Sequence, residues 1–240
     1  MEKQNSQTSK QNWLKSKIVS INENLKEIYQ PYLKNLVINT RQFSEDFSCP
    51  ILMKVHSDIE KVKKRILYVG KETYGWMGTL SDTNDLSVDY LMDRYEEFEF
   101  AKNYPGRNSP FWRFVHTVHK SINGTDYPNG ILWTNFSKCD SKGTTPSPDL
   151  QKLNEIGFDL LKDEIKILKP DVIIFLTGWN YENQFQRVFT GLKYEAIEEN
   201  FLYKCNHESF SNKTFMTMHP MGLNFRKKLN PMISQICNLI

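Results

Sequence analysis

The sequence predicts an α/β fold built on a central, mainly parallel sheet. Short runs of β-branched and aromatic residues alternate with longer segments of helical periodicity, which is typical of strand–helix units. The runs are ILYVG at 66–70, GILWTN at 130–135, DVIIFLTG at 171–178 and TFMTMH at 214–219. Their interiors are almost continuously apolar, as expected when helices cover both faces of a parallel sheet. We therefore expect a three-layer α/β/α sandwich around a four-stranded sheet.

The segments between these runs carry apolar residues at helical spacing and are predicted helices, at 85–100, 110–122, 149–168 and 180–189. Before the first strand, apolar residues recur from Trp13 onward and predict a helix that Pro31 should end or kink. A further helix is expected at 49–62. Residues 1–64 would then form a helical extension packed on a core domain of residues 65–240.

Composition narrows the class of protein. Lys and Arg total 31 against 28 Asp and Glu, and a net charge of +3 does not by itself indicate nucleic-acid binding. The 4 cysteines are scattered without a CxxC pair, so neither a zinc site nor an iron–sulfur cluster is predicted. The N-terminus lacks a signal-peptide core, and no apolar run approaches the ~20 residues that span a bilayer. We expect a cytoplasmic protein with no membrane contact, no metal and no cofactor.

Ligands of such sheets bind beyond the carboxyl ends of the strands, so functional residues are expected in the strand-end loops. The first reads VGKETYGW at 69–76 and matches neither GxxxxGK[ST] nor GxGxxG, which gives no support to nucleoside triphosphate or dinucleotide binding. Gly70 permits close approach of a ligand to the backbone. Glu72 follows it, where a carboxylate can orient a water molecule, although a Glu after a strand is often only a surface residue.

Two further strand ends carry candidate side chains. Asn135 ends the second strand and offers both a donor and an acceptor, the pairing that reads the amide edge of a pyrimidine; it would alternatively cap the next loop. His219 follows the last strand and precedes Pro220, which makes the turn rigid. A neutral imidazole there can donate to a developing anion, a contribution worth ~10²–10³ in rate, whereas a lone His in a turn is usually structural.

In chain order, these motifs resemble those of the uracil-DNA glycosylase superfamily. GKETY at 70–74 is similar to the loop that holds the catalytic water in that family, and NSPFWRFVHTV at 108–118 is similar to its next helix. Asn135 stands where an Asn reads the uracil edge. HPMGL at 219–223 matches the last motif, a His-Pro followed by an apolar residue. The resemblance covers about residues 66–240.

The resemblance implies a monomeric DNA glycosylase that hydrolyses the N-glycosidic bond of uracil or a related damaged base. Glu72 would position water and stabilise the oxocarbenium-like sugar, Asn135 would select the base, and His219 would stabilise the leaving anion. Leu223 would fill the space of the flipped nucleotide.

The remaining implied roles concern binding. The substrate would also meet Gly70, Lys71, Tyr74 and Trp76, of which the two aromatic residues are candidates for stacking on the base. Three consecutive cations would hold the flanking phosphates of DNA, the implied partner: Arg226, Lys227 and Lys228. They would otherwise be a solvated helix start, although cations are disfavoured there by the helix dipole.

A second interpretation stays open. Thr73 and Met221 stand where the family has Pro and Ser, and Glu72 where its best-known branch has Asp. The segment 82–99 holds Asp82, Asp85, Asp89, Asp93, Glu96, Glu97 and Glu99 against Arg94 alone, which is typical of a solvated helix face and would repel a polyanion nearby. The chain would then be a glycosylase-fold protein that binds a nucleobase, a nucleotide or a protein partner without cleaving DNA.

Overall fold

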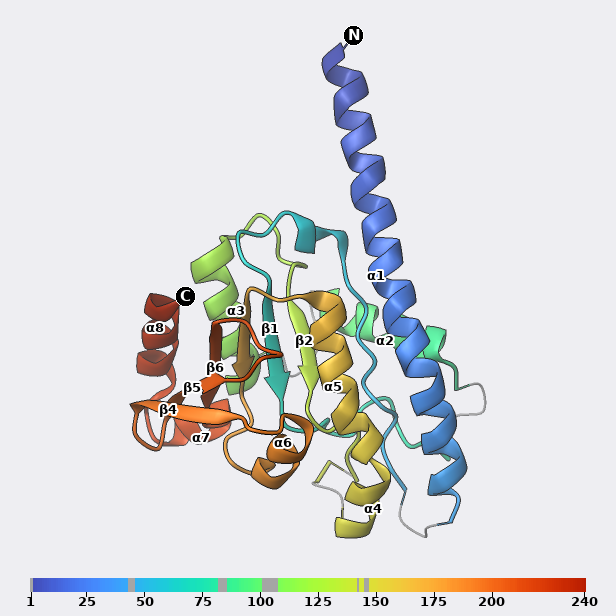
Figure 1. The fold of residues 1–240 in the computed structure, drawn as a ribbon, viewed down its shortest axis with the longest axis vertical. Helices are drawn as coiled ribbons and strands as arrows, with labels where there is room; N and C mark the ends of the chain where they lie inside the picture. The colour runs from blue at the N-terminus through green and yellow to red at the C-terminus, as the bar shows by residue number, and fades with distance from the viewer. Residues whose placement is uncertain (1, 43–45, 82–85, 101–107, 142, 145–146) are drawn as a thin grey trace.

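The computed structural model describes residues 2–42, 46–81, 86–100, 108–141, 143–144 and 147–240. Within these residues the chain forms a mixed six-stranded sheet with helices packed around it (Figure 1). The strands are β1 (Ile66–Gly70), β2 (Leu132–Asn135), β3 (Val172–Phe175), β4 (Lys193–Glu198), β5 (Leu202–Asn206) and β6 (Lys213–Thr217). The helices are α1 (Glu2–Thr40), α2 (Val88–Phe100), α3 (Pro110–Asn123), α4 (Pro148–Leu153), α5 (Glu155–Leu168), α6 (Glu182–Val188), α7 (Pro220–Phe225) and α8 (Leu229–Leu239), with a 3₁₀ turn, η1, at Ser57–Glu60.

The sheet has the strand order β2-β1-β3-β6-β5-β4. Its first four members run parallel, and β5 and β4 continue it antiparallel. The predicted α/β class is confirmed, and the predicted runs are β1, β2, β3 and β6. The expected number of four strands was wrong, because the hairpin of β4 and β5 adds two strands to the sheet. Its outer strand reads KYEAIE and is mostly exposed, so it lacks the apolar run that reveals a buried strand.

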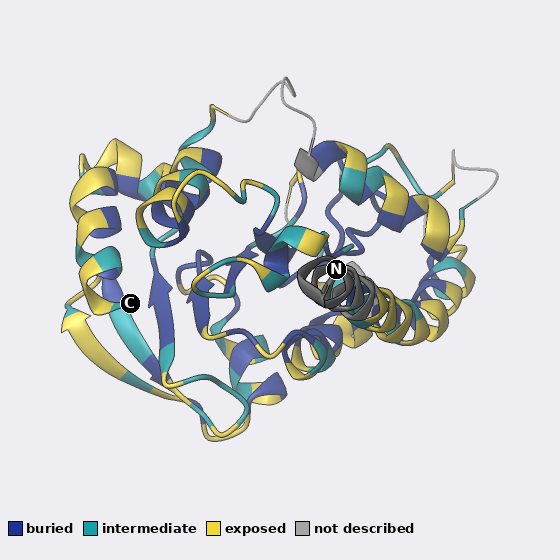
Figure 2. Cartoon of the chain, turned by 90° about the horizontal axis from the view of Figure 1, so that it is seen from above, coloured by how far each residue is buried: buried dark blue, intermediate teal, exposed yellow. Residues whose placement is uncertain are grey.

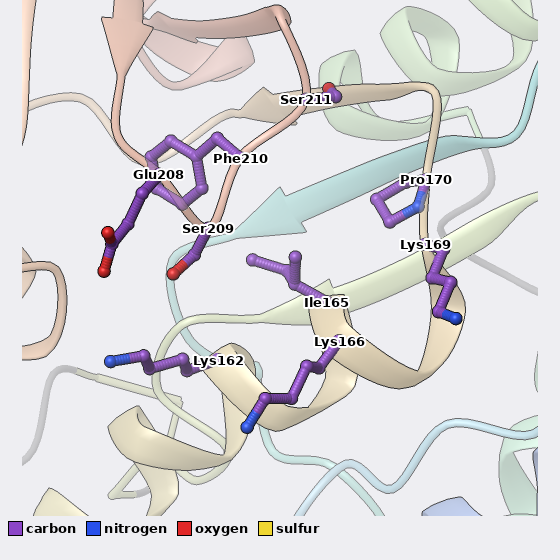
Figure 3. A pocket seen from close by; sticks show the side chains of 9 residues that line it. All are labelled: Lys162, Ile165, Lys166, Lys169, Pro170, Glu208, Ser209, Phe210 and Ser211. Carbon is purple, nitrogen blue, oxygen red and sulfur yellow. The ribbon is translucent and has the colours of Figure 1, made fainter.

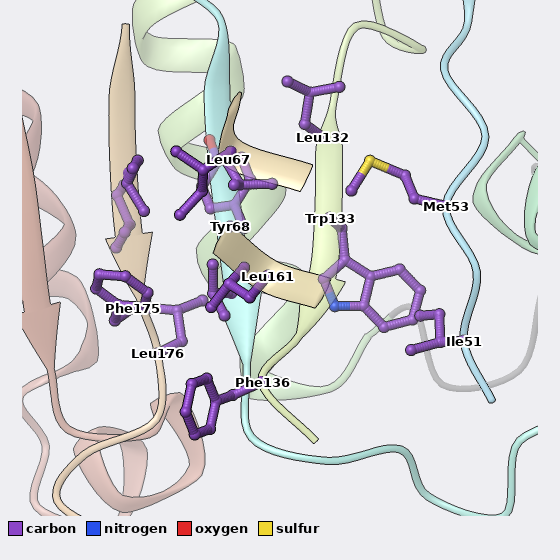
Figure 4. Close-up of a cluster of buried hydrophobic side chains, with 14 of the residues drawn as sticks. Ile51, Met53, Leu67, Tyr68, Leu132, Trp133, Phe136, Leu161, Phe175 and Leu176 are labelled. Carbon is purple, nitrogen blue, oxygen red and sulfur yellow. The ribbon is translucent and has the colours of Figure 1, made fainter. Parts of the chain in front are cut away.

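The parallel strands are buried along their whole length in β1, β2 and β3. Figure 2 shows this as a dark band through the molecule with exposed helix faces outside it. Figure 4 shows side chains of β1 and β3 packed with Leu161 of α5 on the same cluster. A sheet buried in this way holds its strand ends in fixed positions, which matters for the loops that follow them.

Helix α1 continues through Pro31 to Thr40, so the expected end or kink at that proline did not terminate it. A proline inside a helix costs ~3 kcal/mol through one lost hydrogen bond and a steric clash. The turns beyond it bury Tyr32, Leu33 and Leu36, which continue the face formed by Leu25 and Tyr29. Burial of these large side chains, each worth ~1.5–3 kcal/mol, outweighs the proline.

The helix expected at 49–62 is wrong except for η1. Residues 47–55 run extended between the loops that follow β1 and β2, with backbone hydrogen bonds from Ile51 N to Lys138 O at 2.9 Å and from Cys49 N to Gly78 O at 3.0 Å. Ile51 and Met53 pack beside Trp133 in the core (Figure 4). An apolar run this short is compatible with a buried extended segment as well as with a helix. The hydrogen bonds to the two loops favour the extended form here.

A single helix was expected at 149–168, and the structure has two. Asn154 lies between α4 and α5 with its side chain buried. Its Nδ2 donates to Ser137 Oγ at 2.7 Å, and its Oδ1 accepts from Tyr32 OH at 2.9 Å. These bonds to distant parts of the chain favour a break that the helical periodicity of the segment does not show.

A buried ion pair joins α5 to the end of β2. Lys138 Nζ lies 2.7 Å from Glu164 Oε2, and both side chains are fully buried. Lys138 Nζ also donates to Thr134 Oγ1 at 2.6 Å, and Tyr29 OH of α1 donates to Glu164 Oε1 at 2.7 Å. The pair is therefore satisfied by three elements, as buried charges require, and it fixes the residue before Asn135.

The acidic segment is only partly a solvated face. Lys26 of α1 pairs with Asp89 at 2.7 Å, and Lys54 pairs with Asp93 at 2.8 Å and Glu96 at 2.5 Å. Asp82 and Asp85 lie outside the described residues. The carboxylates of α2 thus meet cations of α1 and of the extended segment.

Among the residues described, no helix combines the length and apolar character needed to cross a membrane.

Candidate functional site

The carboxyl ends of β1 and β2 meet directly. Gly70 and Asn135 are register partners, and a Cβ added to Gly70 would overlap Asn135 Oδ1 and lie 3.3 Å from Cε2 of Phe111. Glycine is therefore needed here so that the amide and the ring can approach the backbone. This packing brings together two sequence-predicted residues and one aromatic residue that the sequence analysis did not single out.

Asn135 is almost fully buried, at 2% exposure. Its side-chain amide has no hydrogen bond to any residue that the structure describes. The oxygen and nitrogen of this amide are also absent from the side-chain atoms that are both unpaired and closed to solvent. The amide is therefore still reachable from solvent. Leaving a buried polar group unpaired costs ~1–3 kcal/mol, and a ligand with a complementary amide edge would recover that cost.

His219 is the N-cap of α7, and its Nδ1 accepts a hydrogen bond from Met221 N at 3.3 Å. Burial, together with the nearby ammonium of Lys71 and against the opposing effect of Glu72, lowers the pKa of His219 to about 4. The imidazole is therefore neutral at pH 7. Because Nδ1 accepts, the proton lies on Nε2, which has no partner among the described residues. The site thus holds a neutral N–H donor.

Phe111 is the aromatic residue of this site. Its ring lies nearly parallel to that of His219, with centroids 6.2 Å apart and an interplanar angle of 21°. It occupies the first turn of α3, which begins with Ser109 as N-cap and Pro110 at its first position. The sequence NSPFW contains this signal, because a Ser-Pro helix start fixes where the next side chain points.

Glu72 is engaged at both carboxylate oxygens. Lys71 Nζ lies 3.2 Å from Oε1, and Tyr181 OH donates to Oε2 at 2.6 Å. The side chain is 14% exposed, so the carboxylate is partly reachable. Each carboxylate oxygen has two lone pairs, so a carboxylate can accept from more than one donor at a time.

The loop that carries Glu72 is anchored by Asp140, a residue without a motif of its own in the sequence. Asp140 Oδ2 accepts from Thr73 Oγ1 at 2.5 Å and from Gly75 N at 2.9 Å, and its Oδ1 accepts from Gly143 N at 2.6 Å. Thr73 Oγ1 is also 3.0 Å from Ser48 Oγ. These hydrogen bonds hold Thr73 and the backbone of Gly75 in place within the loop.

The two aromatic residues predicted to stack on a base, Tyr74 and Trp76, lie in different environments in the structure. Trp76 is buried and packs edge-on against Phe98 and Trp133, with centroids 4.9 and 5.9 Å away, so it is a core residue and not a stacking platform. Tyr74 is 89% exposed and lies against Gly143 at the rim. The aromatic face beside Asn135 belongs to Phe111.

Leu223 does not fit the predicted role of a wedge, because it is 0% exposed and belongs to the hydrophobic core. Helix α7 turns it inward, since residues three or four apart share one helix face. Two other apolar side chains of α7 face solvent instead: Met221 is exposed, and Phe225 is 78% exposed. The sequence motif identified the right helix but the wrong face.

The three cations predicted to contact phosphates also differ in their surroundings. Arg226 and Lys227 are exposed, follow Phe225 and form no ion pair with a described residue. Lys228 Nζ instead lies 2.9 Å from Glu198 and 5.1 Å from the ring centroid of Phe201, so it ties α8 to the hairpin. Arg226 is the C-cap of α7, where a cation is favoured by the helix dipole. The three cations thus join the end of α7 to the start of α8, and Lys228 is the N-cap of α8, so the predicted helix start holds for Lys228 alone.

A separate depression of about 540 Å³ lies at the opposite end of the parallel strands (Figure 3). It is lined by Lys162, Ile165, Lys166, Lys169, Pro170, Glu208, Ser209, Phe210 and Ser211. These residues precede β3 and β6, so they lie away from the carboxyl ends that carry Glu72, Asn135 and His219. None of the predicted site residues lines it.

No group of three or more His, Cys, Asp or Glu in the described part of the chain is arranged to hold a metal ion. Comparison with models of protein families finds none that matches, and no curated protein matches the chain. The proposal below therefore depends on the geometry of the site.

Proposed function

We propose that the protein is a DNA glycosylase that hydrolyses the N-glycosidic bond of uracil or a related damaged base, on a glycosylase-like α/β/α sandwich extended by the β4–β5 hairpin. The observation that carries the proposal is the combination at one sheet edge of a neutral imidazole donor, a reachable unpaired amide and a fixed carboxylate. The half-buried ring of Phe111 lies parallel to the imidazole and meets Gly70 beside the amide of Asn135.

Each group has a defined task in that reaction. The flipped base stacks on Phe111, and the amide of Asn135 pairs with its edge, which recovers the cost of an unpaired buried group. As the bond from C1′ to the base nitrogen breaks, Nε2–H of His219 donates to the oxygen of the base that gains negative charge. Lys71 adds a positive charge nearby, as its effect on the pKa of His219 shows.

Glu72 acts on the sugar side. Its carboxylate stabilises the oxocarbenium-like C1′ and orients a water molecule, whose oxygen forms the new bond to C1′ while a proton leaves to the carboxylate. The base departs as an anion and takes a proton from solvent. These steps use only side chains of the chain, and we expect cleavage to survive EDTA.

The DNA strand would cross α7. Phe225, Arg226 and Lys227 form an exposed aromatic and basic surface there, and Arg113 of α3 lies beside it with Nη2 donating to Asn224 Oδ1 at 2.6 Å. Phe225 takes the role of the side chain that fills the gap of the flipped nucleotide, and the cations contact phosphates. We expect the protein to act as a monomer.

The test is release of uracil from a labelled single-stranded oligonucleotide in the presence of EDTA. Glu72→Gln and His219→Ala should each lower cleavage by ~10²–10³ while DNA binding is retained. His207→Ala is the matched control, since His207 Nδ1 also accepts from a backbone N–H two residues on, at 3.1 Å from Ser209 N. Retained binding of a uracil-containing strand with no base release by the folded wild-type protein would favour the second interpretation, binding without cleavage.

A further inference from the structure

The hydroxyl of Tyr181 reaches Glu72 from a loop far away in the sequence. Tyr181 follows β3, whereas Glu72 follows β1, and the two strands are neighbours in the sheet. The hydrogen bond from Tyr181 OH to Glu72 Oε2 is 2.6 Å long, short enough for a charge-assisted bond. It therefore connects two of the strand-end loops across the proposed site.

The ring of Tyr181 is held rigidly. It is 1% exposed and packs at tilted angles against Phe136 and Phe158, with ring centroids 5.4 and 5.6 Å away. Phe136 directly follows Asn135, so the same packing connects the tyrosine to the strand that carries the proposed base-reading amide. Packing fixes the ring, and the ring then fixes the direction of its hydroxyl.

Glu72 needs such an external support. Asp140 anchors the backbone of its loop through Thr73 and Gly75, but the glutamate side chain beyond Cα still has three rotatable bonds. Lys71 contacts the other oxygen, Oε1, from the flexible end of a long side chain. A hydroxyl on a packed ring is more rigid than this ammonium, because a tyrosine has only two side-chain torsions.

We propose that Tyr181 is a positioning residue, which acts through Glu72 by holding the carboxylate in the orientation that directs water to C1′. The inference rests on the proposed glycosylase function and adds a residue to it. Without the hydroxyl the carboxylate would sample other rotamers, and misplacement of a reacting group by about 1 Å can cost ~10²-fold in rate. We expect a loss of ~10-fold, because Lys71 still contacts Glu72.

The experiment is a double-mutant cycle of Tyr181→Phe and Glu72→Gln, with single-turnover cleavage measured at saturating enzyme. Tyr181→Phe should lower the rate constant ~10-fold with unchanged affinity for DNA, because the phenyl ring keeps the packing. In the Glu72→Gln background the same substitution should have little further effect, since its action passes through the carboxylate. Tyr194→Phe is the control: it removes a similar bond, from Tyr194 OH to Glu182 Oε2 at 2.8 Å, and should leave cleavage unchanged.

Three results would overturn the inference: a wild-type rate for Tyr181→Phe, an equal loss in both backgrounds, or an equal loss for Tyr194→Phe. The first leaves the proposed function intact if the wild-type protein cleaves. A wild-type protein that releases no base contradicts the proposed function itself, and the inference with it. Urea unfolding of the same four proteins measures the Tyr181–Glu72 coupling without catalysis, so a missing contact is distinguished from a missing reaction.

Discussion

Gly70 and Asn135 lie side by side at the ends of two parallel strands, with the amide of Asn135 where a Cβ of residue 70 would stand. A Gly70→Ala substitution would therefore push the amide and the ring of Phe111 away from the backbone. We expect a loss of ~10²-fold in base release and a loss of stability of about 1–3 kcal/mol, as for other overpacked sites. Gly191→Ala meets no atom within 4 Å but has a φ of +85°, so it serves as a control for strain without displacement of the site.

The pH dependence of stability should report the neutral state of His219. Its pKa is lowered to about 4 in the folded protein, against ~6.5 when unfolded, so the unfolded chain binds more protons between these values. The contribution of the neutral imidazole is complete above pH ~6.5 and is lost as the pH falls toward 4, by ~1–3 kcal/mol. His219→Gln should flatten this part of the profile.

The measurement is urea unfolding at several pH values for the wild type and His219→Gln. Burial also lowers the pKa of His119, so this second histidine contributes in the same direction and is retained in both proteins. The difference between the two profiles isolates His219. Identical slopes from pH 6.5 down to 4 would show that His219 is not held neutral by the fold.

Leu223 and Phe225 form a matched pair on the two faces of α7. Leu223→Ala should destabilise the protein by ~2–5 kcal/mol, because it leaves a cavity in the core. Phe225→Ala should change stability by less than ~0.5 kcal/mol and instead weaken binding of uracil-containing duplex DNA. Thermal unfolding and fluorescence anisotropy separate the two effects, and a large loss of stability from Phe225→Ala would place that ring in the core instead.

The salt dependence of DNA binding tests the basic surface on α7. Replacing Arg226 and Lys227 by Ala should reduce the slope of log affinity against log salt by ~0.9 per lost contact on duplex DNA and by ~0.7 on single strands. Lys228→Ala should change it less, since Lys228 is engaged with Glu198. Replacing Lys162 and Lys169 at the opposite end of the parallel strands is the control and should leave the slope unchanged. An equal change in the control would indicate a general effect of net charge.

The buried ion pair should be sensitive to the loss of one partner. Lys138→Met leaves the carboxylate of Glu164 buried without its cation, which typically costs ~3–5 kcal/mol. Tyr29→Phe removes one hydrogen bond to the same carboxylate and the bond that Tyr29 OH accepts from Met53 N at 3.3 Å, and should cost ~1.5–3 kcal/mol. Chemical denaturation measures both, and a Lys138→Met protein as stable as the wild type would mean that Glu164 becomes protonated at little cost.

The sequence was sufficient for the features that depend on local pattern. Apolar runs located β1, β2, β3 and β6, and helical periodicity located α3 and α5, because burial on both faces or on one face leaves a direct trace in the order of residues. The ends of those strands also indicated Glu72, Asn135 and His219 as candidates, since parallel strands place their carboxyl ends at the same end of the sheet.

Features that depend on distant partners were decided by the tertiary structure. The exposed strand β4 exists through its pairing with β5, and the extended segment at 47–55 takes its hydrogen bonds from loops remote in the sequence. The orientation of α7 buries Leu223 and exposes Phe225. Core packing takes up Trp76, whereas Phe111 lies beside His219. The sequence by itself indicated candidate residues at the strand ends, whereas the fold decided which of them meet and added others to them. The reason is that side-chain contacts across a sheet edge join segments whose separation along the chain leaves no local signal.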